Sequence, residues 1–323
     1  MDIKSVVIHE IKKQEMVTGA ELFLTKNELD KNNTNVKAII SSLDESFSKK
    51  TIRRARFSND GFKSAIADFK NINLVAVSAA LAQKLKDGIQ NIPAAKGGYL
   101  VFCTYKTART FLSVFLVRNT AGSLLKQAGE ESWDIESIMY LDVDHFAMGV
   151  RVNLDVLNSG SDDRYIHLVK GNTDISDYFE NWIGVDDTKQ EAKDGDALYE
   201  MANKIDLPEG MVDRDALKKQ IFDYVSGRPS KIVNLRELSD YLYKDSDKIV
   251  TYCADNDLDI DGEFKLSGTQ LKKFVKVSVT AGGIKLEASR EKFSASGISV
   301  SNDGNIVHIR SKELADAIKQ NLK

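Results

Sequence analysis

The segment Phe264–Phe293 constrains the fold most, because two strand-like runs flank the dipeptide Gly282-Gly283. Adjacent glycines supply the positive φ angles of a tight hairpin turn, so the two runs should pair as antiparallel strands. The segment also holds seven basic residues against two acidic ones, in a chain whose formal net charge is −3. Much of this positive charge should therefore be displayed on a hairpin, where a phosphate backbone is one natural partner.

Charge of both signs is grouped along the rest of the chain. Thr173–Ala216 contains thirteen acidic residues against four basic ones, a local net charge of −9. A second basic cluster, Lys49–Phe57, precedes it. Such blocks predict one surface that binds an anion and another kept away from it. Solvated helix faces, without any charged partner, are an equally good explanation.

Length and pattern together predict an α+β protein of two domains. A chain of 323 residues can bury two sizeable cores. The boundary is predicted near Val185, giving an N-terminal mixed strand and helix domain over 1–184. The C-terminal domain, 185–323, should contain acidic helices, then a small antiparallel sheet and a final helix.

In the first half, alternation and helical periodicity give a clear series of elements. The predicted helices are 34–48, 71–90 and 175–183, and the predicted strands are 3–11, 20–24, 99–105, 110–117, 146–152 and 165–169. In the second half, helices are predicted at 192–205, 213–225, 235–242 and 247–256. Four short antiparallel strands follow, at 274–280, 283–288, 298–301 and 305–310, and then a helix at 312–322.

Cysteine usage and hydropathy predict a cytoplasmic protein. Cys103 and Cys253 are too few for a disulfide framework. No apolar run approaches the roughly 20 residues that cross a bilayer, so no membrane partner is expected. The chain contains none of the common glycine-rich phosphate loops, serine-nucleophile elbows or zinc motifs, and no cofactor or catalytic residue is predicted.

One short motif carries groups that could hold a metal. Tyr140, Asp142, Asp144 and His145 lie within six residues. Two carboxylates and an imidazole could bind a divalent ion and activate water for phosphodiester cleavage. A turn in which the carboxylates accept backbone N–H groups explains the same residues better, and no metal site is assigned.

Nucleic acid is the partner that the basic residues favour. Lys272 and Lys276 should project from one strand face with Phe274 between them, and Lys285 should join them from the opposing strand. The full set of predicted DNA-binding residues comprises Lys272, Lys273, Lys276, Lys285, Lys49, Lys50, Arg53, Arg54 and Arg56. In the earlier cluster, Phe57 could stack on a base beside the arginines. Without a recognition helix, the contacts should be mainly to the DNA backbone and weakly sequence-specific.

Several motifs, taken in order, carry a resemblance to a known family. They are Gly97-Gly98-Tyr99 with Phe102 and Tyr105, then Tyr140–His145, then Arg164-Tyr165, Ser176–Phe179, and Phe264, Leu271, Phe274 and Gly282–Ile284. In this order and spacing the chain resembles the bacterial nucleoid-associated protein family NdpA, also called YejK-like. The match is poor over Lys26–Ile92, and Ala288-Ser289 departs from the usual continuation after Leu286.

The resemblance implies a cytoplasmic protein of the nucleoid that binds double-stranded DNA. It also implies contact with a DNA-processing enzyme such as a type II topoisomerase, and it implies no catalytic activity. Two alternatives stay open. One is an interaction module whose acidic face regulates a DNA-acting enzyme, and the other is a metal-dependent phosphodiesterase at Asp142, Asp144 and His145. The oligomeric state is left open, a homodimer included.

Overall fold

The computed structural model describes residues 1–58, 60–66, 73–128, 132–160, 163–169, 176–186, 191–228, 230–293 and 296–322. The chain divides into two compact units, Met1–Lys189 and Gln190–Lys323, called Unit 1 and Unit 2 here. Both units mix helices with antiparallel strands, so the predicted α+β class is confirmed. No described helix has the length and hydropathy that crossing a membrane requires.

Unit 1 is built on a seven-stranded antiparallel sheet with the order β2-β1-β4-β5-β8-β9-β3. The strands are β1 (Asp2–Lys12), β2 (Glu21–Phe23), β3 (Arg53–Ala55), β4 (Gly98–Lys106), β5 (Thr110–Val117), β8 (Met148–Asn153) and β9 (Ile166–Val169). Apolar residues alternate between the two faces of β4: Phe102 packs into one core cluster, whereas Val101 and Cys103 pack into another. The sheet is therefore covered on both faces.

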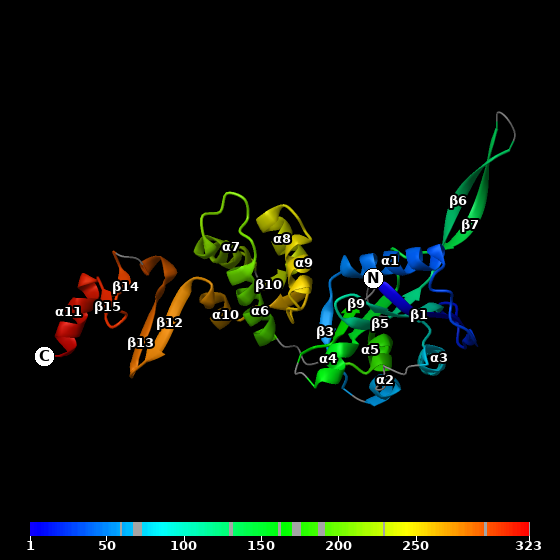
Figure 1. Cartoon of the computed structure of the whole chain (residues 1–323), viewed down its shortest axis with the longest axis horizontal. Helices are drawn as coiled ribbons and strands as arrows, with labels where there is room; N and C mark the ends of the chain where they lie inside the picture. The colour runs from blue at the N-terminus through cyan, green and yellow to red at the C-terminus, as the bar shows by residue number, and fades with distance from the viewer. Residues whose placement is uncertain are drawn as a thin grey trace. The chain divides into compact units, whose positions relative to one another are not determined.

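Helices lie on either side of this sheet (Figure 1). One face is covered by α1 (Thr34–Ser48), whose buried side chains are Ile40, Leu43 and Phe47. The opposite core includes side chains of α2 (Asp60–Ala65), α3 (Leu74–Ile89), α4 (Leu154–Ser159) and α5 (Ser176–Ile183). Asn33 and Asn73 cap the N-termini of α1 and α3 with their side-chain oxygens, which accept N–H groups that no helical carbonyl can reach.

Gly97 and Gly98 lie where three backbone segments come close together. A Cβ at Gly97 would lie 2.0 Å from the carbonyl oxygen of Ile11, and a Cβ at Gly98 would lie 2.6 Å from that of Val117. No side chain fits at either position without displacing a strand. The Gly-Gly-Tyr motif is thus a packing requirement at the start of β4.

A long hairpin leaves the sheet at the end of β5. It consists of β6 (Asn119–Gln127) and β7 (Trp133–Leu141), which pair with each other and with no other described strand. We call these two strands the arm; Figure 1 shows them extending beyond the sheet and its covering helices. The sequence analysis predicted neither strand.

Unit 2 begins with a helical core. It contains α6 (Glu191–Lys204), α7 (Arg214–Ser226), α8 (Leu235–Tyr243), α9 (Lys248–Asp255) and α10 (Gly268–Lys273), together with the strand pair β10 (Ile232–Asn234) and β11 (Glu263–Lys265). Asp213 caps α7 and Asn234 caps α8. Leu198, Leu217, Leu238 and Phe274 are among the side chains buried between these helices.

The remainder of Unit 2 contains β12 (Lys276–Ala281), β13 (Ile284–Ser289), a 3-10 turn at Arg290–Lys292, β14 (Ile298–Val300), β15 (Val307–Ile309) and α11 (Lys312–Asn321). Gly282 and Gly283 have φ angles of 59° and 78°, which confirms the predicted turn between β12 and β13. The four short antiparallel strands predicted here are present, and they form two separate pairs, β12–β13 and β14–β15. We call β12–β13 the lysine hairpin.

Candidate nucleic-acid interface

The chain reaches the lysine hairpin through the short helix α10. Ser267 accepts the N–H of Gln270, while the Gln270 side chain accepts the N–H of Ser267, a capping box that starts α10. Lys272 and Lys273 occupy the last turn of this helix, and the Phe274 side chain is buried against Tyr199. The prediction that Lys272, Phe274 and Lys276 alternate on one strand face is therefore wrong.

The two faces of the lysine hairpin differ in chemistry. Cross-strand pairing opposes Thr280 to Lys285, Ser278 to Glu287 and Lys276 to Ser289, so these side chains share one polar face. Lys285 thus joins the face of Lys276 from the opposing strand, as the sequence pattern indicated. The other face carries Val277, Val279, Ala281, Ile284, Leu286 and Ala288.

A single carboxylate lies between the two lysines of the polar face. Glu287 Oε1 is 3.0 Å from Lys276 Nζ, and its Oε2 is 3.4 Å from Lys285 Nζ. Hydrogen bonds from Lys276 and then Lys285 lower the pKa of Glu287, so it stays ionised between them. The local charge of this trio is therefore that of one free lysine.

The apolar face of the lysine hairpin borders a cleft of about 910 Å³. Its other walls come from β14, β15 and α11, including Ile298, Val307, Leu314 and Ile318. None of the residues of α11 is buried. Residues 276–322 thus gather apolar side chains around an open cleft, unlike the closed core of the helices before them.

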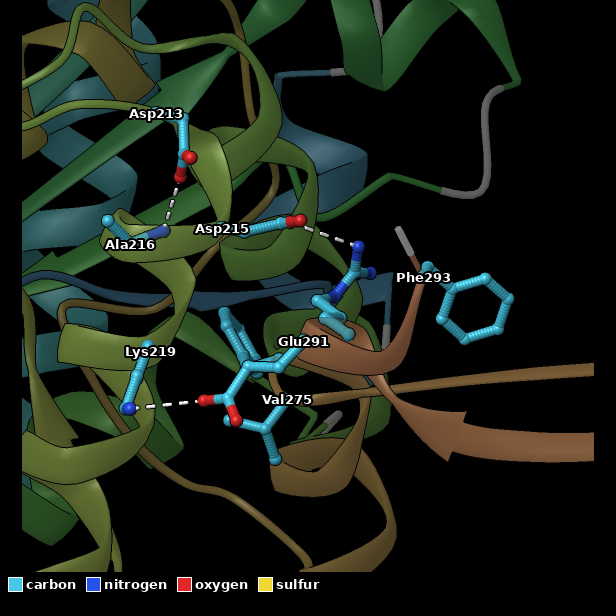
Figure 2. Close-up of a pocket in the computed structure, with 9 residues that line it drawn as sticks. Asp213, Asp215, Ala216, Lys219, Val275, Glu291 and Phe293 are labelled. Atoms are coloured by element: carbon cyan, nitrogen blue, oxygen red, sulfur yellow. Dashed lines mark hydrogen bonds and ion pairs between the residues drawn. The ribbon is translucent and has the colours of Figure 1, made fainter. Parts of the chain in front are cut away.

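The acidic helices are joined to the basic segment by ion pairs. Lys273 Nζ lies 2.6 Å from Asp196 Oδ1 of α6. At the root of the hairpin, Arg290 contacts Asp215 of α7 at 3.2 Å, and Lys219 of α7 contacts Glu291 at 3.1 Å. These two pairs border a pocket of about 370 Å³ (Figure 2). Asp196 and Asp215 therefore lie against basic residues of their own chain, whereas the charge blocks predicted an acidic surface kept away from the anion-binding one.

Most basic side chains of the earlier cluster, Lys49–Phe57, already contact other groups of the chain. Arg53, on the edge strand β3, is 2.9 Å from Glu180 and also donates to the carbonyl of Asp186. Arg54 and Arg56 are half-buried and also have partners within the chain. Phe57 packs against Phe62 and Tyr165, and this packing leaves it unsuited to stacking on a base.

Two lysines precede these arginines, where α1 ends. The Lys49 ammonium is 2.5 Å from Glu45, one turn earlier on α1. The Lys50 ammonium lies over the Phe146 ring, 5.1 Å from its centre. The structure therefore does not gather the cluster into a single free cationic surface.

The Tyr140–His145 motif forms the return from the arm to the sheet. Asp142 Oδ1 accepts hydrogen bonds from the backbone N–H of His145 at 3.1 Å and pairs with His145 Nδ1 at 3.0 Å. Asp144 instead accepts a bond from Ser46 on α1. Within the described ranges, no cluster of three or more His, Cys, Asp or Glu side chains could hold a metal ion. The turn interpretation accounts for the contacts of Asp142, whereas Asp144 binds a side chain of α1.

A polar cluster that the sequence analysis missed lies between α1 and the sheet. The Asp44 carboxylate of α1 forms an ion pair with Arg151 and accepts a 2.8 Å bond from the Tyr105 hydroxyl. The Arg151 guanidinium stacks 4.5 Å from the Phe47 ring centre. Burial, with a smaller contribution from Asp44, raises the pKa of the neighbouring Cys103 thiol to about 12, which leaves it unreactive. Only the tertiary fold brings these residues together, so no local motif predicts them.

Comparison with known proteins identifies the family of the chain. Residues 7–319 match the family model described as nucleoid-associated protein YejK. A nucleoid-associated protein of Enterobacter sp. strain 638 is 23% identical over 300 residues, covering 88% of this chain and 87% of that protein. The nucleoid-associated protein YejK of Escherichia coli K12 is 22% identical over 300 residues with the same coverage. This confirms the resemblance inferred from the motifs and, at the level of the family, the predicted nucleoid association. The chain belongs to the nucleoid-associated protein YejK family.

Proposed function

We propose that this protein binds duplex DNA at the nucleoid with little sequence preference, through Lys272, Lys273, Lys276 and Lys285. The observation that carries the proposal is the segregation of charge on the lysine hairpin. Lys276 and Lys285 share one polar face, and the opposite face is uncharged. Lys272, in the last turn of α10, has no carboxylate partner among the described residues.

The ion pairs within the chain do not prevent this interaction. The side chains of Lys273, Lys276 and Lys285 are 49%, 43% and 64% exposed, and their carboxylate partners are exposed as well. Exposed pairs of this kind contribute about 0–1 kcal/mol each, so a DNA phosphate can replace the carboxylate at little cost. Glu287 and Asp196 then act as competitors that weaken the interaction without abolishing it.

Weak sequence preference follows from the type of contact. Lysine ammonium groups on phosphate oxygens fix the position of a protein on DNA but do not distinguish bases. Four such contacts would make log K fall with log salt with a slope of roughly −3 to −4. Arg53, Arg54 and Arg56 are left out of the proposed interface because they already have partners within the chain. Lys49 and Lys50 are retained as a secondary contact.

Fluorescence anisotropy with a labelled duplex, measured over a salt series, tests the proposal. The double variant Lys276→Glu, Lys285→Glu should weaken binding at low salt at least about tenfold and reduce the salt slope by about 2. The matched control is Lys312→Glu, Lys319→Glu, which makes the same charge change on α11 of the same unit. Equal effects of the two variants, or no effect of the first, would remove the lysine hairpin from the interface.

The protein-interaction alternative is less well supported than direct DNA binding. Asp196 and Asp215 contact basic groups of their own chain, so the acidic helices do not form a free DNA-like surface there. Contact with a DNA-processing enzyme such as a type II topoisomerase stays a prediction, tested by co-purification from nuclease-treated lysate. The family is not a known enzyme family, and we do not propose phosphodiesterase activity.

A further inference from the structure

Both ends of the lysine hairpin meet the same tyrosine of the helical core. The chain enters the hairpin after Phe274, whose ring packs edge-on against the Tyr199 ring of α6, with 5.4 Å between the ring centres. It leaves the hairpin at Arg290, whose guanidinium donates a hydrogen bond to the Tyr199 hydroxyl. A single contact would let the hairpin pivot, whereas contacts at both of its ends fix its direction.

Arg290 also closes the base of the hairpin through its backbone. Its N–H donates to the carbonyl of Val275 at 2.9 Å, so the bond joins the residue before β12 to the residue after β13. This bond extends the antiparallel ladder beyond its last cross-strand pair, Lys276 with Ser289. Any shift of the Arg290 backbone therefore moves both strands together.

The Arg290 side chain is turned towards the helices. It is 19% exposed, its Nη1 lies 3.2 Å from Asp215 Oδ1 of α7, and its Nε is buried. Its Cζ lies 5.8 Å from the centre of the Tyr199 ring. A planar guanidinium holds two partners in fixed directions, whereas a lysine ammonium is a point charge on a flexible stem. Arg290 thus bridges α6 and α7, and Asp215 balances its charge.

A second ion pair, of opposite polarity, fixes the register of this contact. Lys219, one turn after Asp215 on α7, lies 3.1 Å from Glu291, the residue after Arg290 (Figure 2). The helix therefore offers an acid and then a base, while the turn offers a base and then an acid. The exchanged pairing would oppose like charges in both pairs, which disfavours it.

The direction of the hairpin matters because the proposed DNA contacts lie on two elements. Lys272 and Lys273 belong to α10, whose Leu271 is buried in the helical core, whereas Lys276 and Lys285 project from the hairpin. Contacts made together to one duplex are stronger than the same contacts made separately, since each raises the effective concentration of the next. A hairpin free to pivot would lose this advantage without losing any lysine.

We propose that Arg290 is a positioning residue of the DNA-binding surface. Through Tyr199 and Asp215 it holds the lysine hairpin at one angle to α10, so that the lysines of both elements reach one duplex together. Arg290 itself makes no contact with DNA in this arrangement, which rests on the DNA binding proposed above.

Substitutions of Arg290 separate positioning from direct contact with DNA. Arg290→Lys keeps the positive charge but loses the planar fork that bridges Tyr199 and Asp215. Binding of a labelled duplex at low salt should weaken at least about fivefold. The salt slope should fall by about 2, because two of the four lysines no longer engage the same duplex. Arg290→Gln should behave alike. A direct phosphate contact would instead leave Arg290→Lys close to wild type and lower the slope of Arg290→Gln by about 1.

Tyr199→Phe tests the same contact without changing any charge. It removes the hydroxyl that accepts from Arg290 and keeps the ring that packs against Phe274. Binding should weaken by about two- to tenfold, as the loss of one hydrogen bond does. The matched control is Tyr243→Phe, which removes a hydroxyl that donates to the carbonyl of Asp206 elsewhere in the same unit. This control should bind DNA as the wild type does.

The direction of the hairpin can be measured without DNA. Spin labels at Ser278→Cys on the hairpin and Ser226→Cys at the end of α7 occupy exposed positions and report the distance between hairpin and helical core. The native thiols of Cys103 and Cys253 are buried and should stay unlabelled. Double electron–electron resonance of the full-length protein should give a narrow distance distribution, which becomes broad when Arg290→Gln is added.

The two measurements together decide the role of Arg290. A broadened distance distribution, with weaker binding and a lower salt slope in Arg290→Lys, supports positioning. A broad distribution before Arg290 is changed, or a narrow one in Arg290→Gln, overturns it, as does wild-type affinity in Arg290→Lys. If the Arg290 variants lose their circular dichroism signal, Tyr199→Phe decides by the same criteria. A wild type that binds no duplex DNA overturns the proposed function itself, and Arg290 then has no DNA contacts to align.

Discussion

The arm of Unit 1 and the lysine hairpin of Unit 2 are both two-stranded and outside any larger sheet, yet they use their apolar faces differently. The apolar face of the lysine hairpin borders a cleft shared with β14, β15 and α11 of the same chain. On the arm, by contrast, Leu125, Trp133, Ile135 and Met139 share one face and are 62%, 69%, 67% and 63% exposed. The lysine hairpin thus has apolar neighbours within its own unit, whereas these apolar side chains of the arm are open to solvent.

The roots of the two hairpins differ in the same way. The chain enters the lysine hairpin through Phe274, which is 1% exposed and packs edge-on against the Tyr199 ring at 5.4 Å. It enters the arm through Arg118 and Asn119, whose side chains donate hydrogen bonds to the carbonyl of Gly97, just before β4, and to the hydroxyl of Tyr99, within β4. A hairpin that begins at a buried aromatic side chain is attached to the folded core of its unit. Polar side chains at the start of a hairpin only set the direction in which it extends. The two hairpins should therefore respond differently to mutation.

The largest expected effect is on the folding of Unit 2. Phe274→Ala should lower the free energy of unfolding by about 3–5 kcal/mol, because it removes a fully buried ring and leaves a cavity. Trp133→Ala on the arm should change the unfolding free energy of Unit 1 by less than about 0.5 kcal/mol, because the ring is already exposed. Urea unfolding at low protein concentration, followed by hydrogen exchange of each unit, measures both. Similar losses for the two variants would contradict the distinction between the roots.

The contrast between the hairpins also marks what sequence could predict. Helix 34–48 and strand 110–117 were predicted with the bounds observed for α1 and β5, because each buries a regular apolar pattern. Gly282-Gly283 likewise predicted the hairpin turn. The arm escaped prediction because its strands bury little, and because Leu124 and Leu125 are adjacent, which breaks the alternation that identifies a half-buried strand.

The candidate interface was predicted only in part. Its lysines were identified, but a strand was assigned from 274 where the chain first completes α10. The signal for that helix was present in the sequence, since Ser267 and Gln270 have the spacing of a capping box. The ion pairs of Lys273 with Asp196 and of Arg290 with Asp215 join residues more than 70 positions apart, and no local pattern predicts them. The predicted boundary near Val185, and with it the independent folding of the two domains, stays a prediction.

A smaller effect is the dependence of stability on pH, which should differ between the two units. His9 of β1 is buried, with Nε2 2.8 Å from Ser78 Oγ and with Nδ1 accepting the N–H of Thr25. Burial lowers its pKa below the usual 6.5, so the unfolded chain takes up a proton more readily than the folded one. Unit 1 should therefore lose stability as the pH falls below about 6.5, through His9 and also through His167, whose pKa burial lowers in the same direction. The only histidine of Unit 2, His308, is exposed.

Tryptophan fluorescence during urea unfolding isolates this effect, since Trp133 and Trp182 both belong to Unit 1. The change in unfolding free energy between pH 7 and pH 5 should be smaller in His9→Gln than in the wild type. The variant is less stable at pH 7 because it loses buried contacts, so only the difference between the two pH values is informative. An equal pH dependence in both proteins would rule out His9 as the source.

The smallest expected effect tests whether the carboxylate on the lysine hairpin competes with DNA. Glu287 is exposed and shared by Lys276 and Lys285, so it cannot fully satisfy both ammonium groups in water. Glu287→Gln keeps the size of the side chain and removes its charge, which leaves both lysines available to phosphates. If the proposed interface is correct, affinity for duplex DNA should rise by about two- to fivefold at low salt, the range expected for an exposed ion pair.

Glu313→Gln on the exposed helix α11 is the matched control, because it removes the same charge outside the proposed contact. Because the gain comes from one more unit of positive charge facing the DNA, it should shrink as salt is raised. Weaker binding by Glu287→Gln would mean that the carboxylate positions the lysines instead of competing for them, and the hairpin would then bind DNA as a preassembled trio.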